Sequence, residues 1–366
     1  MRVPMLDLVK KHAPIREQLA DCLLEVLDSG RYINGPYVER FENALADYCG
    51  VPCALGVSSG SDALILGLMA LGVKPGDEII TTPFTFFATV GAIARVGAKP
   101  VFVDVSPEDF NMNPALIEEK ITQNTVGIIP VSLFGQTPDL DPILATAARN
   151  GLWVMEDAAQ SIGARYKEKM SGAFGTMGTF SFFPAKNLGG LGDGGAILTH
   201  DEVLADKMRT LRNHGGKTLY FYEFIGGNFR LDALQAAILS VKLPHLLDWE
   251  AVRRTNAAFY QAELKDIEDI TVPVEMPNRH HVYNQFSLRI TNGQRDAYKK
   301  RLESEGIGHA IYYPLCLHQQ GCFSYLGHAE GDFPIAEQMA QEVLAIPVFT
   351  DQPEVVVEAL KKGPLS

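Results

Sequence analysis

The chain has 366 residues, 46% of them hydrophobic, and this length exceeds the roughly 250–300 residues at which one hydrophobic core usually divides into domains. The 44 acidic residues outnumber the 32 basic ones, which gives a formal net charge of −12. Because no tract rich in Lys and Arg interrupts this balance, we expect two domains and no nucleic-acid partner.

The N-terminal segment does not have the pattern of a secretory signal. Residues 1–19 contain no apolar core followed by a small-residue cleavage site, and Asp7 and Lys10 interrupt the apolar positions. The most apolar long stretch, residues 54–73, contains three serines and an aspartate, so it lacks the roughly 20 apolar residues of a membrane span. We therefore expect a cytoplasmic protein without a membrane-spanning helix.

The cysteines and histidines do not predict a disulfide framework or a metal site. The five cysteines form no CxxC pair, and an odd number in a long chain favours free thiols. His280 and His281 are adjacent, a spacing that suits neither one helical face nor one strand face for metal binding. We assign no metal ligand.

Strand and helix patterns alternate between about residues 51 and 199, as is typical of βαβ units around a mostly parallel sheet. Residues 63–71 (ALILGLMAL) are apolar on all sides, which predicts a helix buried inside the domain. The predicted strands are Glu78–Thr81, Pro100–Val105, Gly127–Ser132, Leu152–Glu156, Gly178–Phe182 and Ala196–Thr199.

A second, smaller domain is predicted after residue 245. The pattern LDALQAAILSVKL is helical up to Pro244, and a charged helix resumes at once and could link two domains. We expect a large domain at 1–245 and an α+β domain at 246–366, on which the N-terminal segment could pack. The expected elements there are a strand at Phe286–Ile290 and helices around Gln294–Glu305 and Pro334–Val343.

Two reactive side chains follow predicted strands. Asp157 stands just past the strand WVME, and ligands of parallel α/β sheets gather at that edge. Ser181 and Lys186 follow another strand and precede five glycines and Asp193, a composition that allows close approach of backbone to a ligand. A lone lysine is usually a solvated surface residue, but the nearby acid and hydroxyl favour a functional one.

Two further signals lie upstream. Gly60 and Ser61 begin the buried helix, where unpaired N–H groups and the helix dipole favour a phosphate, although Ser and Asp are also ordinary helix caps. Phe84, Phe86 and Phe87 could offer a ring to a flat cofactor, although plain core packing alone would also explain them.

Together these residues fit pyridoxal 5′-phosphate (PLP). Its phosphate requires amides and hydroxyls, its ring a stacking surface, its pyridine nitrogen a carboxylate and its aldehyde an amine. An anion cradle, an aromatic ring, Asp157 and Lys186 supply these groups. The sequence therefore predicts a PLP site in which Lys186 forms a Schiff base with the cofactor.

Seven strings along nearly the whole chain resemble the DegT/StrS nucleotide-sugar aminotransferases, a branch of the fold-type I PLP enzymes. The resemblance implies a large domain with a mostly parallel, seven-stranded sheet, a small C-terminal domain and a homodimer with shared active sites. The strings are SGRYINGP (29–36), SSGSDAL (58–64), PFTFFAT (83–89), GAKPVFVDV (97–105), EDAAQSIGA (156–164), SFFPAKNLGGLGDGGAI (181–197) and GGNFRLDALQAAI (226–238).

The resemblance also implies a role for each cofactor-binding residue. Lys186 corresponds to the Schiff-base lysine, Asp157 to the partner of the pyridine nitrogen and Gln160 to the neighbour of the phenolic oxygen. Phe86 corresponds to the stacking ring. The phosphate-binding positions correspond to Gly60, Ser61 and Ser181, with Asn228 reaching the phosphate of the other subunit.

Substrate-binding positions are implied at Arg230, Tyr312, Tyr313 and His318. Relatives often have His where Tyr312 stands, and that His binds a sugar carboxylate in some of them. Tyr312 therefore argues against a uronic-acid substrate, although Arg230 could still supply a positive charge. The form of the lysine loop favours amination of a keto sugar at C3 over C4.

The expected reaction is transfer of an amino group from an amino acid, by analogy glutamate, to a nucleotide-linked keto sugar for polysaccharide or glycoside biosynthesis. Two alternatives remain open. One is a PLP-binding regulatory protein without enzymatic activity, against which the intact Lys186, Asp157 and Gln160 argue. The other is a PLP-dependent sugar dehydratase. Relatives with that activity have histidine in place of the lysine, whereas this chain keeps Lys186. The nucleotide and the sugar configuration are not predicted.

Overall fold

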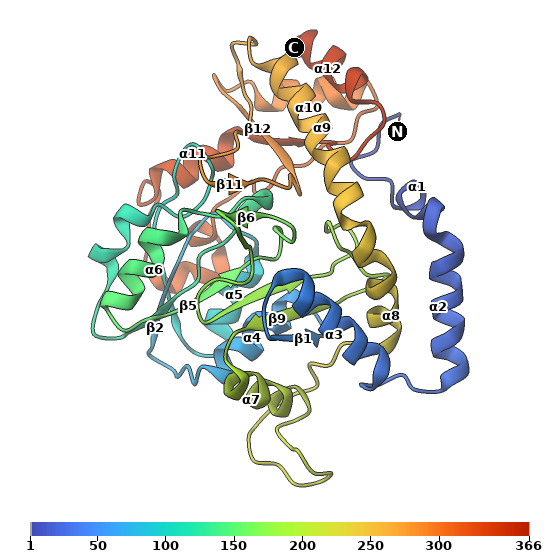
Figure 1. Ribbon diagram of the computed structural model, residues 1–366. Coiled ribbons are helices and arrows are strands. Elements are labelled where there is room, and N and C mark those ends of the chain that lie inside the picture. The colour runs from blue at the N-terminus through green and yellow to red at the C-terminus, as the bar shows by residue number, and fades with distance from the viewer. Residues whose placement is uncertain (1, 366) are drawn as a thin grey trace.

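The central element of the computed structural model is a seven-stranded sheet, and the model describes residues 2–365 (Figure 1). In spatial order the strands are β1 (Cys53–Val57), β9 (Gly195–Thr199), β8 (Met177–Ser181), β5 (Trp153–Asp157), β4 (Thr125–Ile128), β2 (Glu78–Thr81) and β3 (Lys99–Phe102). All neighbouring pairs are parallel except those of β9, which is antiparallel to both its neighbours. The expected mostly parallel α/β fold is confirmed.

The sheet is covered by helices on both faces. On one face the apolar helix α4 (Gly60–Ala70) packs with α5 (Phe87–Arg95) and α7 (Glu202–Arg212), and on the other α3 (Pro36–Cys49) packs with α8 (Ala233–Lys242). The predicted burial of α4 is confirmed after its first turn, since residues 63–68 and Ala70 are buried. Helix α6 (Leu140–Arg149) packs its apolar face under β4 and β5.

Several predicted strand limits differ from the structure. The strand expected at 127–132 ends at Ile128, because Pro130 has no N–H with which to continue the ladder. The strand expected at 100–105 ends at Phe102. The edge strand β1 was not predicted, because its sequence CALGV carries a glycine and lacks the β-branched run of the other strands.

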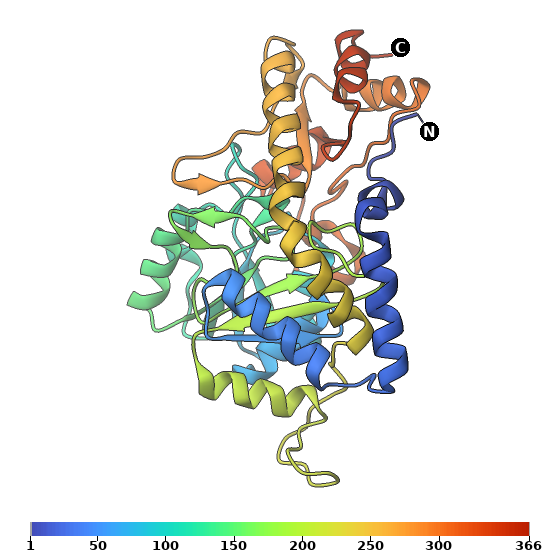
Figure 2. The same cartoon turned by 45° about the vertical axis from the view of Figure 1, so that its right-hand side comes forward.

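The long helix α9 (Leu246–Leu264) leads from the sheet into a smaller C-terminal lobe (Figure 2). It follows α8 after one 3₁₀ turn at Leu243–His245, because Pro244 interrupts the helical hydrogen bonds without reversing the chain. The lobe has a sheet of β10 (Ile270–Thr271), β12 (Phe286–Ile290) and β13 (Val343–Ile346), with α10 (Arg295–Ser304) and α12 (Pro353–Lys361).

The two ends of the chain meet in this lobe. Val3 forms a parallel bridge to Ile307, and its side chain lies in the core around β12. Helix α11 (Pro334–Glu342), by contrast, packs on Phe102 and Val131 of the large lobe. The division at residues 245 and 246 therefore stays a prediction, because segments from each side pack on both lobes.

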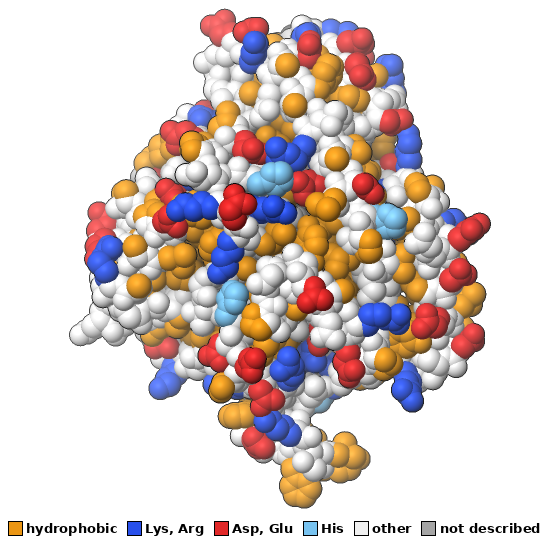
Figure 3. Space-filling model, viewed as in Figure 1, with side chains coloured by type: hydrophobic (Ala, Val, Ile, Leu, Met, Phe, Trp, Pro, Cys, Tyr) orange, Lys and Arg blue, Asp and Glu red, His pale blue; other side chains and the backbone are white. Residues whose placement is uncertain are grey.

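The remaining elements lie at the periphery. A protruding hairpin, residues 213–226, extends below α7 and carries the exposed side chains of Leu219, Tyr220 and Phe221 (Figures 1 and 3). The other elements are α1 (Leu8–His12), α2 (Arg16–Ser29), β6 (Arg165–Tyr166), β7 (Lys169–Met170) and β11 (Arg279–His280). Within residues 2–365, no helix combines the length and the apolar character needed to cross a bilayer.

Candidate active site

A cavity of about 440 Å³ opens where β5 and β8 end and α4 begins. This is the carboxyl edge of the parallel strands, where ligands of such sheets bind. The cavity gathers, from one chain, all the predicted cofactor-binding residues except Asn228, and with them two of the predicted substrate residues. These are Gly60, Ser61, Phe86, Asp157, Gln160, Ser181, Lys186, Tyr312 and Tyr313.

One end of the cavity is the N-terminus of α4. The Ser59 side chain caps the helix by accepting a hydrogen bond from the Asp62 N–H at 3.0 Å, so the N–H groups of Gly60 and Ser61 remain for a ligand. A Cβ at Gly60 would stand 2.6 Å from Cβ of Ser181, so only glycine fits here. This helix end, with the Ser61 and Ser181 hydroxyls beside it, fits a phosphate group.

Asp157 also lines the cavity, as the last residue of β5. The Thr89 hydroxyl donates to its Oδ2 at 2.7 Å, and the Ala159 N–H donates to its Oδ1 at 3.2 Å. Burial raises the pKa of Asp157, whereas these two donors and the Lys186 amine act in the opposite direction. A buried carboxylate held in this way fits the protonated pyridine nitrogen of PLP. Sequence reasoning missed Thr89, whose only signal was a polar residue ending the string PFTFFAT.

Lys186 extends from the loop that follows β8. Its backbone N–H donates to the carbonyl of Phe183 at 2.8 Å, which closes a turn at the start of the loop. Burial lowers the pKa of Lys186 from 10.5 to about 8, and the nearby Asp157 opposes this shift. A substantial fraction of the amine is therefore neutral near pH 8, as a nucleophile or a general base requires.

Gln160 and Tyr313 form a hydrogen-bonded part of the cavity wall. Gln160 accepts a hydrogen bond from the Phe134 N–H at 2.8 Å and donates from Nε2 to the Tyr313 hydroxyl at 3.0 Å. The Phe86 ring is 57% exposed, and its centroid lies 6.2 Å from that of Tyr313. An exposed ring on the cavity wall is available to stack on a flat cofactor.

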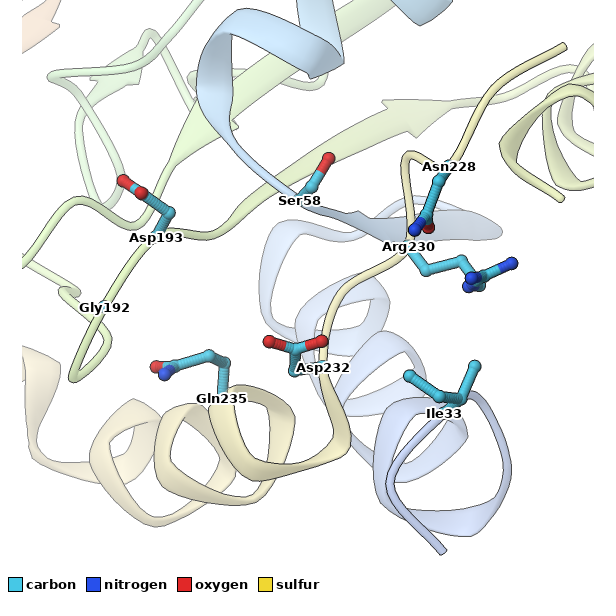
Figure 4. Close-up of a pocket in the computed structure, with 8 residues that line it drawn as sticks. All are labelled: Ile33, Ser58, Gly192, Asp193, Asn228, Arg230, Asp232 and Gln235. Carbon is cyan, nitrogen blue, oxygen red and sulfur yellow. The ribbon is translucent and has the colours of Figure 1, made fainter. Parts of the chain in front are cut away.

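Three predicted site residues lie outside this cavity. Asn228 and Arg230 line a neighbouring polar cavity of about 410 Å³, which shares Asp193 with the first (Figure 4). His318 has a fully buried side chain that hydrogen-bonds Oε1 of Glu337 at 3.0 Å, and burial lowers its pKa. His318 therefore does not line either cavity in this chain.

The residues present fit PLP at each of its four functional groups. One cavity is lined by all four groups. Gly60 leaves room for the phosphate, Asp157 supplies a buried carboxylate, and Phe86 an exposed ring. Lys186 supplies an amine of lowered pKa. Within residues 2–365, no group of three or more His, Cys, Asp or Glu side chains is placed to hold a metal ion. The fold and this site define a PLP-dependent enzyme of fold type I.

The chain belongs to the DegT/DnrJ/EryC1/StrS aminotransferase family, whose model matches residues 14–361. It is 48% identical to a "Pleiotropic regulatory protein" of Geobacillus stearothermophilus, with 98% of each chain covered. It is 43% identical to a UDP-N-acetyl-3-dehydro-alpha-D-glucosamine 3-aminotransferase of Acidithiobacillus ferrooxidans, with 95% and 93% covered. The structure is similar to that of Streptomyces venezuelae DesV in complex with a ketimine intermediate, with a TM-score of 0.95, 39% identity and 98% of both chains covered. The expected family, cofactor and aminotransferase class are confirmed.

Proposed function

We propose that this enzyme transfers an amino group from glutamate to a keto sugar linked to a nucleoside diphosphate, at C3 of the sugar. The observation that carries the proposal is the pairing of Lys186 and Asp157 across one cavity, with the Lys186 pKa lowered to about 8. The relative from Acidithiobacillus ferrooxidans is named for a C3 amination, and the lysine loop supports the same position. A role in polysaccharide or glycoside biosynthesis, in the cytoplasm, completes the proposal.

When bound, PLP supplies an electron sink and a carrier for the amino group. Lys186 binds it, and the Lys186 amine moves the proton between the α-carbon of the donor and C4′ of the cofactor. Asp157 holds the proton on the pyridine nitrogen, and Thr89 keeps the Asp157 carboxylate oriented. Gln160 and Tyr313 form the wall from which the phenolic oxygen is oriented, and Phe86 excludes water from one face of the ring.

We further propose that the active form is a homodimer in which Asn228 serves the partner subunit. Asn228 is exposed and lines the polar cavity next to Arg230, with Asp193 on the opposite side, and does not line the cavity of Lys186 (Figure 4). The protruding hairpin nearby exposes large apolar side chains, among them Ile225 at 93% and Tyr220 at 79%. Exposed apolar surface of this kind is typical of a protein interface.

The test is a pair of assays on the PLP-loaded protein. Glutamate should be converted to 2-oxoglutarate, and the amino group should then appear on a UDP- or dTDP-linked 3-keto sugar, with mass spectrometry and NMR locating the new C–N bond. A matched 4-keto sugar is the control. Amination of the 4-keto sugar alone would reverse the C3 assignment, and no reaction with any amino donor would contradict the proposed activity.

A second candidate is a regulatory protein that binds PLP without turnover, because one relative carries a regulatory name. The same first assay separates the two candidates. When glutamate is added, a protein that only binds PLP would keep the visible absorption band of the Schiff base. The aminotransferase would lose that band and release 2-oxoglutarate. A PLP-dependent sugar dehydratase would consume no amino donor.

A further inference from the structure

Three basic side chains are buried together behind the active-site lysine. Lys242, Lys11 and Arg253 are only 1%, 5% and 3% exposed. In the part of the chain that the structure describes, none of them lies within 4.0 Å of a carboxylate oxygen, although buried cations usually pair with one. Each of them donates instead to backbone carbonyls. The segments that contain these carbonyls therefore explain why the three side chains are buried here.

Two of the three side chains hold the loop that carries Lys186. Nζ of Lys11 donates to the carbonyl of Asn187 at 3.0 Å, and Nζ of Lys242 donates to the carbonyl of Gly189 at 2.8 Å. These carbonyls belong to residues one and three positions after Lys186. The Gly190 N–H closes the loop by donating to the Phe182 carbonyl at 2.8 Å. The backbone after Lys186 is thus held by hydrogen bonds at three of its residues, Asn187, Gly189 and Gly190.

These two amines are carried by packed helices. Lys242 is the last residue of α8, which packs against α2 and α3 (Figure 2). Lys11 lies in α1, and its Nζ is 4.1 Å from the ring centroid of Trp249 on α9. The loop is closely packed on itself, since a Cβ at Gly189 would come within 2.3 Å of the Pro184 carbonyl oxygen. A small change in the path of the loop would therefore move Lys186.

The third side chain holds the facing wall. NH1 of Arg253 donates to the carbonyls of Tyr283 and Asn284 at 3.1 Å each, and the next residue, Gln285, lines the cavity. The Asn187 side chain joins this wall to the lysine loop by donating to the Val282 carbonyl at 3.4 Å. The cluster therefore supports two segments of the cavity from the side away from the ligand.

We propose that Lys11 and Lys242 are positioning residues for the reaction, which hold the lysine loop by its carbonyls so that the Lys186 amine reaches C4′ of the cofactor. This inference rests on the proposed function, in which Lys186 moves the proton. Burial lowers the pKa of Lys242 to about 8 and that of Lys11 to about 6, and a neutral amine can still donate to a carbonyl. The N–H donor, rather than the charge, is the group that matters.

The first test is kinetic. Lys242→Met keeps the apolar stem and removes the donor, and it should lower kcat for the glutamate half-reaction by about 10- to 100-fold, since a displacement of about 1 Å can have this effect. KM for glutamate should change less than threefold. The matched control is Lys207→Met, which removes a lysine that also donates to a backbone carbonyl, that of Ala70 at 2.6 Å, but at the far end of α4. The control should keep wild-type kcat.

Lys11→Met should lower the same kcat, with its exposed neighbour as the control. Lys10 forms an ion pair with Asp351 at 2.5 Å, and Lys10→Met should therefore leave kcat unchanged. Two results would overturn the proposal, because they would indicate a general effect on folding. One is an equal loss of kcat in Lys11→Met and Lys10→Met. The other is a loss of kcat in Lys207→Met as large as that in Lys242→Met.

The second test does not depend on activity. Amide hydrogen exchange of the cofactor-free protein should be at least tenfold faster in the peptide covering residues 182–194 of Lys242→Met than in the wild type. Peptides of α7 and α12 should not change. Unchanged exchange in this peptide would contradict the positioning role, even if the enzyme is active. Faster exchange in a protein that transfers no amino group would instead contradict the proposed function and keep the structural role of the two lysines.

Discussion

The two neighbouring cavities differ in how complete they are within one chain. In the cavity of Lys186 the functional groups have partners, since Asp157, Gln160 and Tyr313 all form hydrogen bonds within the site. In the cavity of Asn228, Arg230 is half-buried, and its Nε has no hydrogen-bond partner among residues 2–365. The hydrogen bonds of the first cavity are made within one chain, whereas the second cavity leaves one buried donor, Nε of Arg230, available for a ligand or a partner chain.

The largest effect is expected in the complete cavity. Lys186→Ala removes the single lysine among the described residues that line that cavity, and with it both the attachment of PLP and the proton transfer. The rate of the glutamate half-reaction should fall by about 10⁴-fold, at the upper end of general acid–base contributions. Borohydride treatment of the PLP-loaded wild type should fix the cofactor on the peptide that contains residue 186. Cofactor fixed on another lysine would contradict the assignment.

A smaller effect on kcat is expected at Thr89, which contacts Asp157. Thr89→Val removes the hydroxyl that donates to Asp157 and keeps the shape of the side chain, so kcat should fall by about 10- to 100-fold, the value of a lost hydrogen bond to a charged group. The Thr89 hydrogen bond lowers the pKa of Asp157, and its loss therefore raises that pKa further. The acid limb of the kcat profile should move to higher pH. An unchanged limb would show that Asp157 does not control it.

The incomplete cavity can be tested by mixing an inactive variant, Lys186→Ala, with an impaired one, Asn228→Ala. If Asn228 serves the partner subunit, Asn228→Ala should lower kcat/KM by about tenfold through the loss of a hydrogen bond to the phosphate. Lys186→Ala and Asn228→Ala subunits, unfolded together and refolded, would form hybrids with one intact site. About a quarter of wild-type activity should then return, because half of the dimers are hybrids with one active site of two. If each site belongs to one chain, the mixture gains nothing.

Sequence and structure agree best where local pattern determines the result. The βαβ pattern predicted β2 with its limits, and the apolar run after Gly60 predicted the buried helix α4. The antiparallel direction of β9 could not be predicted, since direction depends on the connection through the lysine loop and not on the strand residues. Thr89 and Lys242 were missed for a similar reason, because their function depends on contacts 68 and 53 positions away in the chain.

Substitution of His318 gives the smallest expected effect on activity. It tests whether this side chain belongs to the core or to the substrate site. The resemblance placed it at the substrate, but its side chain is buried beside Glu337 and Phe333. His318→Leu should therefore leave kcat/KM for the keto sugar within about twofold of the wild type. The unfolding free energy should fall by about 1–3 kcal/mol, because the Glu337 carboxylate loses a buried partner. A large loss of kcat/KM with unchanged stability would place His318 at the substrate in the assembled enzyme.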